Sequence, residues 1–156
     1  MLLSAETRPH PDGTYNVIRV IDGDTVIVDN QGKPETVRIL GMNTPETVDP
    51  KRPVQCYGHE ASDHAKAVLS GTYVTLESDL SQDATDKYGR TLAYVILADG
   101  TNFELSMIQE GYAFEYTYDR PYKYQKEFKA AQAEAKSAEL GLWSPTTCNG
   151  ELKPVS

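Results

Sequence analysis

The sequence predicts an α+β fold in which three α-helices decorate a closed barrel of five β-strands. Five short runs rich in β-branched residues lie between turn-forming residues, and three segments carry apolar residues at helical spacing. The chain has 156 residues, of which 39% are hydrophobic, and this suffices for one domain with a full core. An OB-type barrel is the economical arrangement, because a five-stranded sheet that closes hides its edges.

The strands follow from alternating and β-branched runs. We expect them at residues 16–21, 25–28, 35–40, 73–77 and 90–97. The first three form a meander, because a turn at Asp22-Gly23 and another over residues 29–32 join them closely. In the third strand Val37 and Ile39 share one face while Arg38 points to the other, since side chains alternate along a strand.

The helices follow from apolar residues three or four positions apart. We expect them at residues 58–69, 103–110 and 122–139. Asn102 can cap the second helix, and Gly111 can stop it. The segment 43–55 contains three prolines and is expected to be a long loop. Loops of that length in compact domains are often functional.

The pattern divides the chain into a loose N-terminal arm (1–13), one OB-fold domain (14–146) and a C-terminal tail (147–156). No apolar run approaches the length needed to cross a bilayer, so we expect no membrane contact. The first five residues are too short and lack the basic segment of an intact signal peptide. A mature domain whose signal has been removed would look the same.

The chain is acidic, with 15 lysine and arginine residues, 23 aspartate and glutamate residues and a formal net charge of −8. Proteins that coat nucleic acids use a basic face, so this charge argues against that class. It does not exclude an enzyme that holds a single phosphate through a cation and two arginines.

The two cysteines, Cys56 and Cys148, lie far apart in sequence. Their spacing is not that of a zinc site, which has closely paired ligands. They are either two unrelated buried thiols or one disulfide in an exported protein, tying the tail to the middle of the chain. Our hypothesis is the disulfide, because Cys56 directly precedes the first helix and Cys148 follows the end of the last one.

One group of polar residues offers oxygen ligands to a divalent cation. Asp24 supplies an anionic oxygen, and Asp22 can contribute through a water molecule. Asn43 can add its amide oxygen and Thr44 its backbone carbonyl. Hard oxygen donors of this kind suit a hard divalent cation.

A second group suits the hydrolysis of a phosphodiester, which needs an activated water and stabilisation of the charge that grows on the phosphate oxygens. Arg38 and Arg90 can each fork onto phosphate oxygens, which lysine does less well. Glu46 is placed to take a proton from water. These residues indicate a phosphodiesterase site.

Each fragment also has a purely structural interpretation. Asp22-Gly23 is a common hairpin turn, and Thr44-Pro45-Glu46 can start a helix. A lone Arg38 is most often a strand residue that faces water, and residues 88–90 alone form a simple turn before a strand. No fragment decides the function by itself.

Together and in this order, the fragments resemble the staphylococcal nuclease (thermonuclease) family. The resemblance covers roughly residues 16–143, nearly all of the chain outside its two tails. It is carried by Asp22-Gly23-Asp24-Thr25, Arg38, Thr44-Pro45-Glu46, Tyr57-Gly58, Glu60-Ala61, Asp86-Lys87-Tyr88-Gly89-Arg90, Leu92-Ala93-Tyr94, Gly111 and Leu142-Trp143. Ordered matches on this scale are highly specific.

The resemblance implies an OB-fold barrel with three helices and calcium-dependent cleavage of DNA and RNA to 3′-phosphate and 5′-hydroxyl ends. It also implies which residues bind Ca²⁺. Asp24 and Asn43 stand at ligand positions, and the Thr44 carbonyl joins them.

The resemblance further implies a catalytic set of Arg38, Glu46 and Arg90, in which Glu46 is the usual general base. The substrate-binding residues that it implies are Lys87 and Tyr88 at the phosphate end of a nucleotide, and Tyr116 and Tyr118 near its base. Stacking on tyrosines tolerates any base, so little sequence preference is expected.

Two features depart from the family. The family usually has aspartate where this chain has Asn43, which removes one ligand charge and predicts a weak calcium site. Staphylococcal nuclease itself is basic, whereas this chain is acidic, so we expect weaker non-specific affinity for the polymer.

The sequence therefore predicts a secreted, monomeric, calcium-dependent endonuclease whose substrates are DNA and RNA. One alternative is a catalytically weak nucleic-acid-binding OB module of the same family, and another is a nuclease that uses a different divalent ion. Modules that lose catalysis typically lose the arginines and the glutamate. Arg38, Glu46 and Arg90 are all present, which favours the enzyme.

Overall fold

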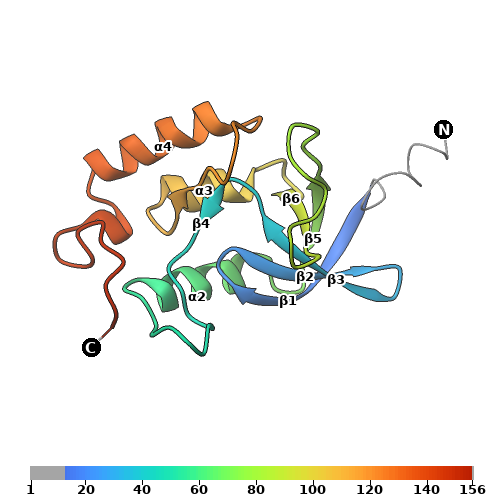
Figure 1. The fold of residues 1–156 in the computed structure, drawn as a ribbon, viewed down its shortest axis with the longest axis horizontal. Coiled ribbons are helices and arrows are strands. Elements are labelled where there is room, and N and C mark those ends of the chain that lie inside the picture. The colour runs from blue at the N-terminus through green and yellow to red at the C-terminus, as the bar shows by residue number, and fades with distance from the viewer. Residues whose placement is uncertain (1–12, 156) are drawn as a thin grey trace.

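The computed structural model describes residues 13–155 and shows a closed barrel of five strands with three α-helices, which confirms the predicted fold class (Figure 1). The strands follow the order β1-β2-β3-β6-β5 around the barrel. The pair β3 and β6 is parallel and the other neighbours are antiparallel. The barrel strands are β1 (Thr14–Asp22), β2 (Thr25–Asn30), β3 (Lys33–Ile39), β5 (Tyr73–Glu77) and β6 (Thr91–Ile96). The predicted arm, except for its last residue, lies outside the described residues.

The helices are α2 (Gly58–Leu69), α3 (Phe103–Gln109) and α4 (Gln125–Ser137), followed by the short 3-10 helix η1 (Gly141–Trp143). Helix α2 packs against β1, and α3 packs against β6 and against α4, which runs along its outer side (Figure 1). Asn102 caps α3 as predicted, since its side-chain oxygen accepts a hydrogen bond from the Leu105 N–H (3.0 Å). Within the described residues, no helix has both the length and the apolar character to span a membrane.

The structure differs from the prediction in a pair of short strands and in the start of the last helix. Two short strands, β4 (Met42–Asn43) and β7 (Phe114–Glu115), form a separate antiparallel pair. Runs of two residues have no periodicity, so the sequence did not indicate them. Helix α4 begins three residues later than expected, because Tyr122 turns into the barrel end, where its hydroxyl donates to Glu115 (2.8 Å) and lies 3.2 Å from the Gly41 carbonyl oxygen.

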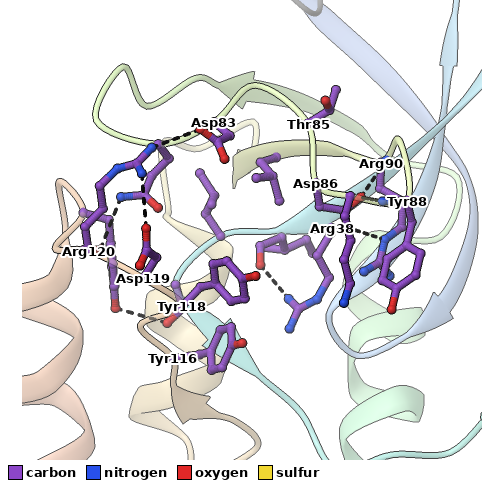
Figure 2. A pocket seen from close by; sticks show the side chains of 17 residues that line it. Arg38, Asp83, Thr85, Asp86, Tyr88, Arg90, Tyr116, Tyr118, Asp119 and Arg120 are labelled. Atoms are coloured by element: carbon purple, nitrogen blue, oxygen red, sulfur yellow. Dashed lines mark hydrogen bonds and ion pairs between the residues drawn. The ribbon is translucent and has the colours of Figure 1, made fainter.

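Strand β3 has the predicted alternation of faces. Val37 and Ile39 are fully buried, whereas the Arg38 side chain is 16% exposed and lines a pocket (Figure 2). The hydrophobic interior of the barrel therefore fixes the direction in which this arginine points.

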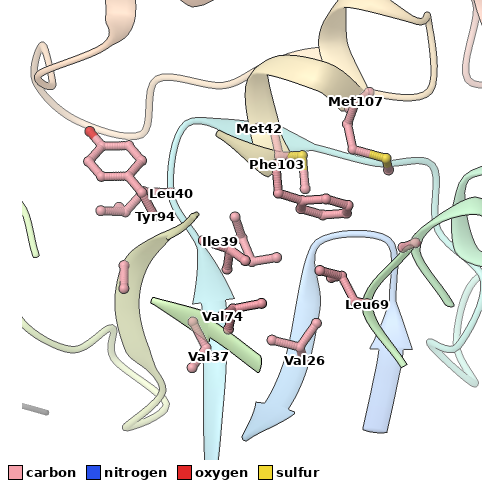
Figure 3. Packing of buried hydrophobic residues seen from close by; sticks show 14 of the residues in the cluster. Val26, Val37, Ile39, Leu40, Met42, Leu69, Val74, Tyr94, Phe103 and Met107 are labelled. Atoms are coloured by element: carbon pink, nitrogen blue, oxygen red, sulfur yellow. The ribbon is translucent and has the colours of Figure 1, made fainter. Parts of the chain in front are cut away.

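The core is continuous from the barrel interior to the helices (Figure 3). Val26, Val37 and Val74 fill the space between the strands, and Phe103 and Met107 of α3 cover them. A smaller cluster, at the end of α4, contains the buried residues Ala135, Leu142, Trp143 and Cys148. The helices are thus fixed to the barrel by apolar contacts that leave the end of β3 free for polar residues.

The C-terminal segment lies against the loop that precedes α2. Cys56 and Cys148 form a disulfide, with their Cα atoms 5.9 Å apart. The Cys56 N–H donates to the Lys153 carbonyl (2.7 Å), and the Val155 N–H donates to the Val54 carbonyl (2.8 Å). The sequence has no pattern after residue 144, so these backbone contacts were not predicted.

Glu104 is a fully buried carboxyl group in the first turn of α3. One of its oxygens accepts the Val95 N–H (3.1 Å), and the other has no hydrogen-bond partner among the described residues. Burial raises the pKa of Glu104 well above its usual value, and nearby Glu77 raises it further. The folded protein therefore keeps the Glu104 proton to a higher pH than the unfolded chain does.

This buried acid predicts a pH-dependent stability. The contribution of protonated Glu104 is complete below the unfolded pKa of about 4.3, and it is lost as pH rises towards the raised folded pKa. Glu104→Gln cannot titrate, so its stability relative to the parent should grow with pH by about 1.4 kcal/mol per unit over that range. Urea unfolding from pH 4 to pH 8 measures the free energy of unfolding of both proteins, with exposed Glu134→Gln as the control. A difference between Glu104→Gln and the parent that does not change with pH would contradict the prediction.

Candidate active site

A pocket of about 610 Å³ opens where the end of β3 meets two loops (Figure 2). Residues 38–41 come from β3 and the turn after it, residues 82–92 come mostly from the connection between β5 and β6, and residues 116–122 lie between β7 and α4. The pocket is thus built from three parts of the chain that the barrel brings together.

Arg38 is held beside this pocket by four oxygen atoms. Its Nη1 donates to the carbonyls of Ile39 (2.7 Å) and Met42 (3.0 Å), and its Nη2 donates to the Asn43 side-chain oxygen (3.3 Å). Nη2 also lies 3.4 Å from a carboxylate oxygen of Asp24. The guanidinium is fixed as a rigid plane, and its Nε–H has no hydrogen-bond partner among the described residues.

Arg90 reaches the pocket from a turn that Asp86 organises. Asp86 accepts the backbone N–H groups of Tyr88 (2.9 Å) and Arg90 (2.9 Å) and the Arg90 Nε–H (2.7 Å). Burial alone would raise the pKa of Asp86, but the hydrogen bonds from Arg90 and Tyr88 and the charge of Arg90 lower it. Asp86 therefore stays ionised and orients Arg90, whose Nη groups bond to no other described residue. The sequence did not predict this role.

Aromatic rings lie between and beside these cations. The Tyr88 ring centre is 5.2 Å from Lys87 Nζ and 5.4 Å from the Arg90 guanidinium carbon. Tyr116 and Tyr118 line the opposite wall and are 38% and 77% exposed (Figure 2). Flat exposed rings beside cations can hold a phosphate and stack on a planar group attached to it.

The far end of the pocket is closed by contacts that the sequence did not indicate. Arg120 pairs with Asp83 (3.1 Å) and Asp119 (3.4 Å), and its Nε–H donates to the Ser81 carbonyl (2.6 Å). The Gln82 amide donates to the Pro121 carbonyl (3.0 Å). These bonds join the two loops and set the distance between the pocket walls. No motif marks them, because they are single polar residues in irregular segments.

Asp24 lies next to Arg38 and is 7% exposed. One carboxylate oxygen accepts the Thr44 N–H (3.0 Å), and the other accepts the Thr25 hydroxyl (3.1 Å). Asp24 therefore joins the β1–β2 turn to the loop that follows β4. Asp24 and Thr44 are 20 positions apart in sequence and lie in contact here. Both can therefore contribute oxygen atoms to one ligand site.

Asp22 is the second acid at this position and is 6% exposed. It accepts the Gly23 N–H (3.0 Å) and the Thr47 hydroxyl (2.8 Å). Burial and the neighbouring charge of Asp24 raise the pKa of Asp22 to about 6. A bound cation would relieve the electrostatic repulsion between these two buried acids.

The predicted cation ligands fit a hard divalent ion such as Ca²⁺. Asp22 and Asp24 supply negative charge, and Asn43 and the Thr44 carbonyl supply neutral oxygens. The Thr44 hydroxyl is buried without a hydrogen-bond partner among the described residues. Those residues contain no cluster of three or more acidic, histidine or cysteine side chains suited to a metal. Such a site has low charge and depends on neutral donors.

Glu46 lies apart from the pocket lining. One carboxylate oxygen accepts the N–H groups of Val48 (2.9 Å) and Asp49 (2.8 Å), and the other pairs with Arg52 (2.8 Å). Burial alone would raise the pKa of Glu46, but these hydrogen bonds and the Arg52 charge lower it. In this arrangement all the hydrogen bonds of the Glu46 carboxylate are to residues of its own loop.

The structure thus gathers most predicted site residues but not all of them. The pocket is lined by Arg38, Lys87, Tyr88, Arg90, Tyr116 and Tyr118. The predicted cation ligands adjoin it through Arg38. Glu46 is tied to the same region only indirectly, because its neighbour Thr47 bonds to Asp22.

These features define an OB-fold protein with a cationic, aromatic-lined pocket beside paired acids. Residues 36–145 match the model of a protein family described as staphylococcal nuclease homologue. The chain is 48% identical over 131 residues to a thermonuclease of Staphylococcus hyicus, which covers 84% of this chain and 76% of the relative. It is 46% identical over 130 residues to a thermonuclease of Staphylococcus intermedius, covering 83% and 76%. It is 43% identical over 127 residues to the endonuclease YncB of Bacillus subtilis (strain 168), covering 81% and 59%.

The chain therefore belongs to the staphylococcal nuclease family.

The buried Thr44 hydroxyl gives a prediction on stability. Thr44→Val keeps the side-chain shape that packs against Gly23 and removes an unpartnered polar atom. In the presence of a chelator, we expect the variant to be as stable as the parent or about 1 kcal/mol more stable. Thr72→Val is the control, since its hydroxyl bonds to the Leu69 carbonyl (2.7 Å) and its loss should cost about 1 kcal/mol. Urea unfolding decides; a loss for Thr44→Val as large as the control's would mean that the hydroxyl has a partner.

Proposed function

We propose that the protein is a calcium-dependent, sugar-non-specific endonuclease that cleaves DNA and RNA to 3′-phosphate and 5′-hydroxyl ends. The proposal rests on one observation: Arg38 and Arg90 line the same tyrosine-lined pocket. The acids Asp22 and Asp24 lie beside this pocket. The chain is a nuclease hydrolase, since its family and its relatives are nucleases.

The two arginines can bind one phosphodiester group from two sides. Arg38 keeps Nε–H and Arg90 keeps its Nη groups free of other described partners, so each has donors for phosphate oxygens. Both are held by fixed acceptors, and so little reorganisation is needed as negative charge grows on the phosphate. A bound calcium ion would neutralise the phosphate and polarise the bond that breaks.

Glu46 is the candidate for the proton acceptor. Its lowered pKa keeps it ionised at neutral pH, so it can take a proton from a water that attacks phosphorus. Its carboxylate is bonded to Val48, Asp49 and Arg52, and catalysis requires one oxygen to leave these partners. The 46–52 loop is therefore the part of the site that must rearrange.

The pocket also supports cleavage of both DNA and RNA. Tyr116 and Tyr118 offer ring faces, on which any base can stack, and sugar recognition is not needed for this contact. Lys87 and Tyr88, on the opposite wall, can contact a terminal phosphate. Sequence-independent binding of this kind gives little preference for one polymer.

The rival function is a nucleic-acid-binding module without catalysis. One experiment separates the two: plasmid DNA and an RNA transcript are incubated with the protein plus calcium, magnesium or a chelator. Cleavage with calcium alone supports the proposal. Binding without cleavage under all three conditions supports the module, and cleavage with magnesium alone points to a different ion.

We also propose that the enzyme is monomeric and acts outside the cytoplasm. The disulfide between Cys56 and Cys148 supports export, because such bonds persist in oxidising compartments. The net charge of −8 supports a soluble monomer, because like-charged molecules repel one another.

The arginines give a prediction on the rate. Arg38→Lys and Arg90→Lys should each lower kcat/KM by a factor that corresponds to about 2–4 kcal/mol, because a planar contact to the transition state is lost. Arg19→Lys, on the exposed part of β1, is the matched control and should keep the parent rate. Steady-state kinetics on DNA, with circular dichroism to verify folding, measures the effect. Near-parental turnover of a folded lysine variant would show that its arginine is not catalytic.

Asn43 gives a prediction on the metal. Asn43→Asp restores a ligand charge and should tighten calcium binding by about 1–2 kcal/mol, or about ten- to thirtyfold. Asn149→Asp adds the same charge at an exposed position of the tail and should leave the affinity unchanged. Calorimetric titration of calcium, with and without a nucleotide bisphosphate, measures it. Equal calcium affinity of the parent and Asn43→Asp would remove Asn43 from the ligand set.

A further inference from the structure

Gln55 holds the backbone of Glu46 from both sides. Its side-chain oxygen accepts the Glu46 N–H (2.8 Å), and its own N–H donates to the Glu46 carbonyl (2.9 Å). The Gln55 carbonyl in turn accepts the N–H of Gly58, the first residue of α2 (2.9 Å). One glutamine therefore fixes Glu46 to the start of a helix.

The two ends of the 46–55 loop are also packed closely. A Cβ atom placed on Gly58 would lie 2.9 Å from the Glu46 carbonyl oxygen and 2.8 Å from the Thr47 methyl group. The Thr47 hydroxyl is bonded to Asp22 of the barrel (2.8 Å). Glu46 thus stands between a barrel acid and a helix, and only the part of the loop between Thr47 and Val54, residues 48–53, is open to change.

The C-terminal segment completes this arrangement. Residues 54–56 pair with residues 153–155 through two backbone hydrogen bonds of 2.7 and 2.8 Å, and Gln55 is bridged to Pro154. The disulfide of Cys56 adds a covalent link next to Gln55. The backbone of Gln55 is held on one side by α2 and on the other by the end of the chain.

We propose that Gln55 is a positioning residue for Glu46, and that residues 153–155 hold Gln55 in place. The proposal rests on the proposed function, because it affects catalysis only where Glu46 takes the proton. An acceptor at position 55 fixes the Glu46 peptide while the rest of the loop rearranges around the carboxylate. Residues 153–155 are then part of the frame of the active site.

Two substitutions separate positioning from general stability. Gln55→Met keeps the side-chain length but loses the oxygen that accepts the Glu46 N–H. We therefore expect kcat on DNA to fall about tenfold or more, while KM stays within about twofold of the parent value. Gln55→Glu retains an acceptor oxygen and should keep kcat within about threefold of the parent. Asn102→Ala, which removes a bond of the same kind at the start of α3, should lower Tm but leave kcat unchanged.

A second measurement does not depend on activity. Hydrogen exchange at the Glu46 amide, followed by NMR, should become about tenfold faster in Gln55→Met, because the amide loses its only described acceptor. Val155→Pro, which removes the N–H that bonds to Val54, should speed the same exchange in the full-length chain. Asn102→Ala should leave it unchanged.

The outcomes distinguish this proposal from the function on which it rests. Parental kcat together with parental Glu46 exchange in Gln55→Met would overturn the positioning role. An equal fall of kcat in Gln55→Met and Gln55→Glu would also overturn it, since the acceptor would then be irrelevant. A parent protein that cleaves neither DNA nor RNA would overturn the proposed function, while the exchange rates still decide whether Gln55 holds Glu46.

Discussion

The site depends on the way in which Arg38 is held. It stands one residue before the end of β3, where the barrel strand turns towards β4, and its Nη1 closes that turn by bonding to the carbonyls of Ile39 and Met42. Its Nη2 donates to the Asn43 side-chain oxygen and forms an ion pair with Asp24. One planar cation therefore shapes the turn, orients an amide and balances a buried acid. A flexible ammonium group cannot make these contacts together, because it lacks the fixed fork of donors.

Most of the fold could be predicted because its elements have strong periodicity. Helix α2 and strand β5 have the bounds that the sequence indicates, since apolar spacing and a closing glycine or turn mark both ends. The pair β4 and β7 was missed because two residues are too few to show alternation. The start of α4 was placed too early because no side-chain cap marks it: the helix begins after Tyr124, and the Tyr122 side chain belongs to the barrel end.

The residue types of the site could be predicted better than their contacts. Short motifs indicated Arg38, Lys87, Tyr88 and Arg90, and all four line one pocket. The bonds of Arg120 to the opposite loop were not predictable, because they join irregular segments about 37 to 39 positions apart. The contacts of Gln55 with Glu46 and with the end of the chain were missed for the same reason. Contacts of this kind depend on the path of the loops, which local sequence does not encode.

The net charge of −8 and the cationic pocket are compatible because they act over different distances. At physiological salt, exposed charges are screened beyond about 8 Å, so acids remote from the pocket weaken the long-range attraction of a polyanion but act little on a phosphate already in contact. Arg38 and Arg90 are partly buried, with side chains 16% and 32% exposed, and are therefore screened less. In the proposed function, affinity would come from contacts with one phosphate, a bound cation and bases stacked on the tyrosine rings. Such a nuclease would contact its polymer locally, so the acidic surface away from the pocket does not prevent binding.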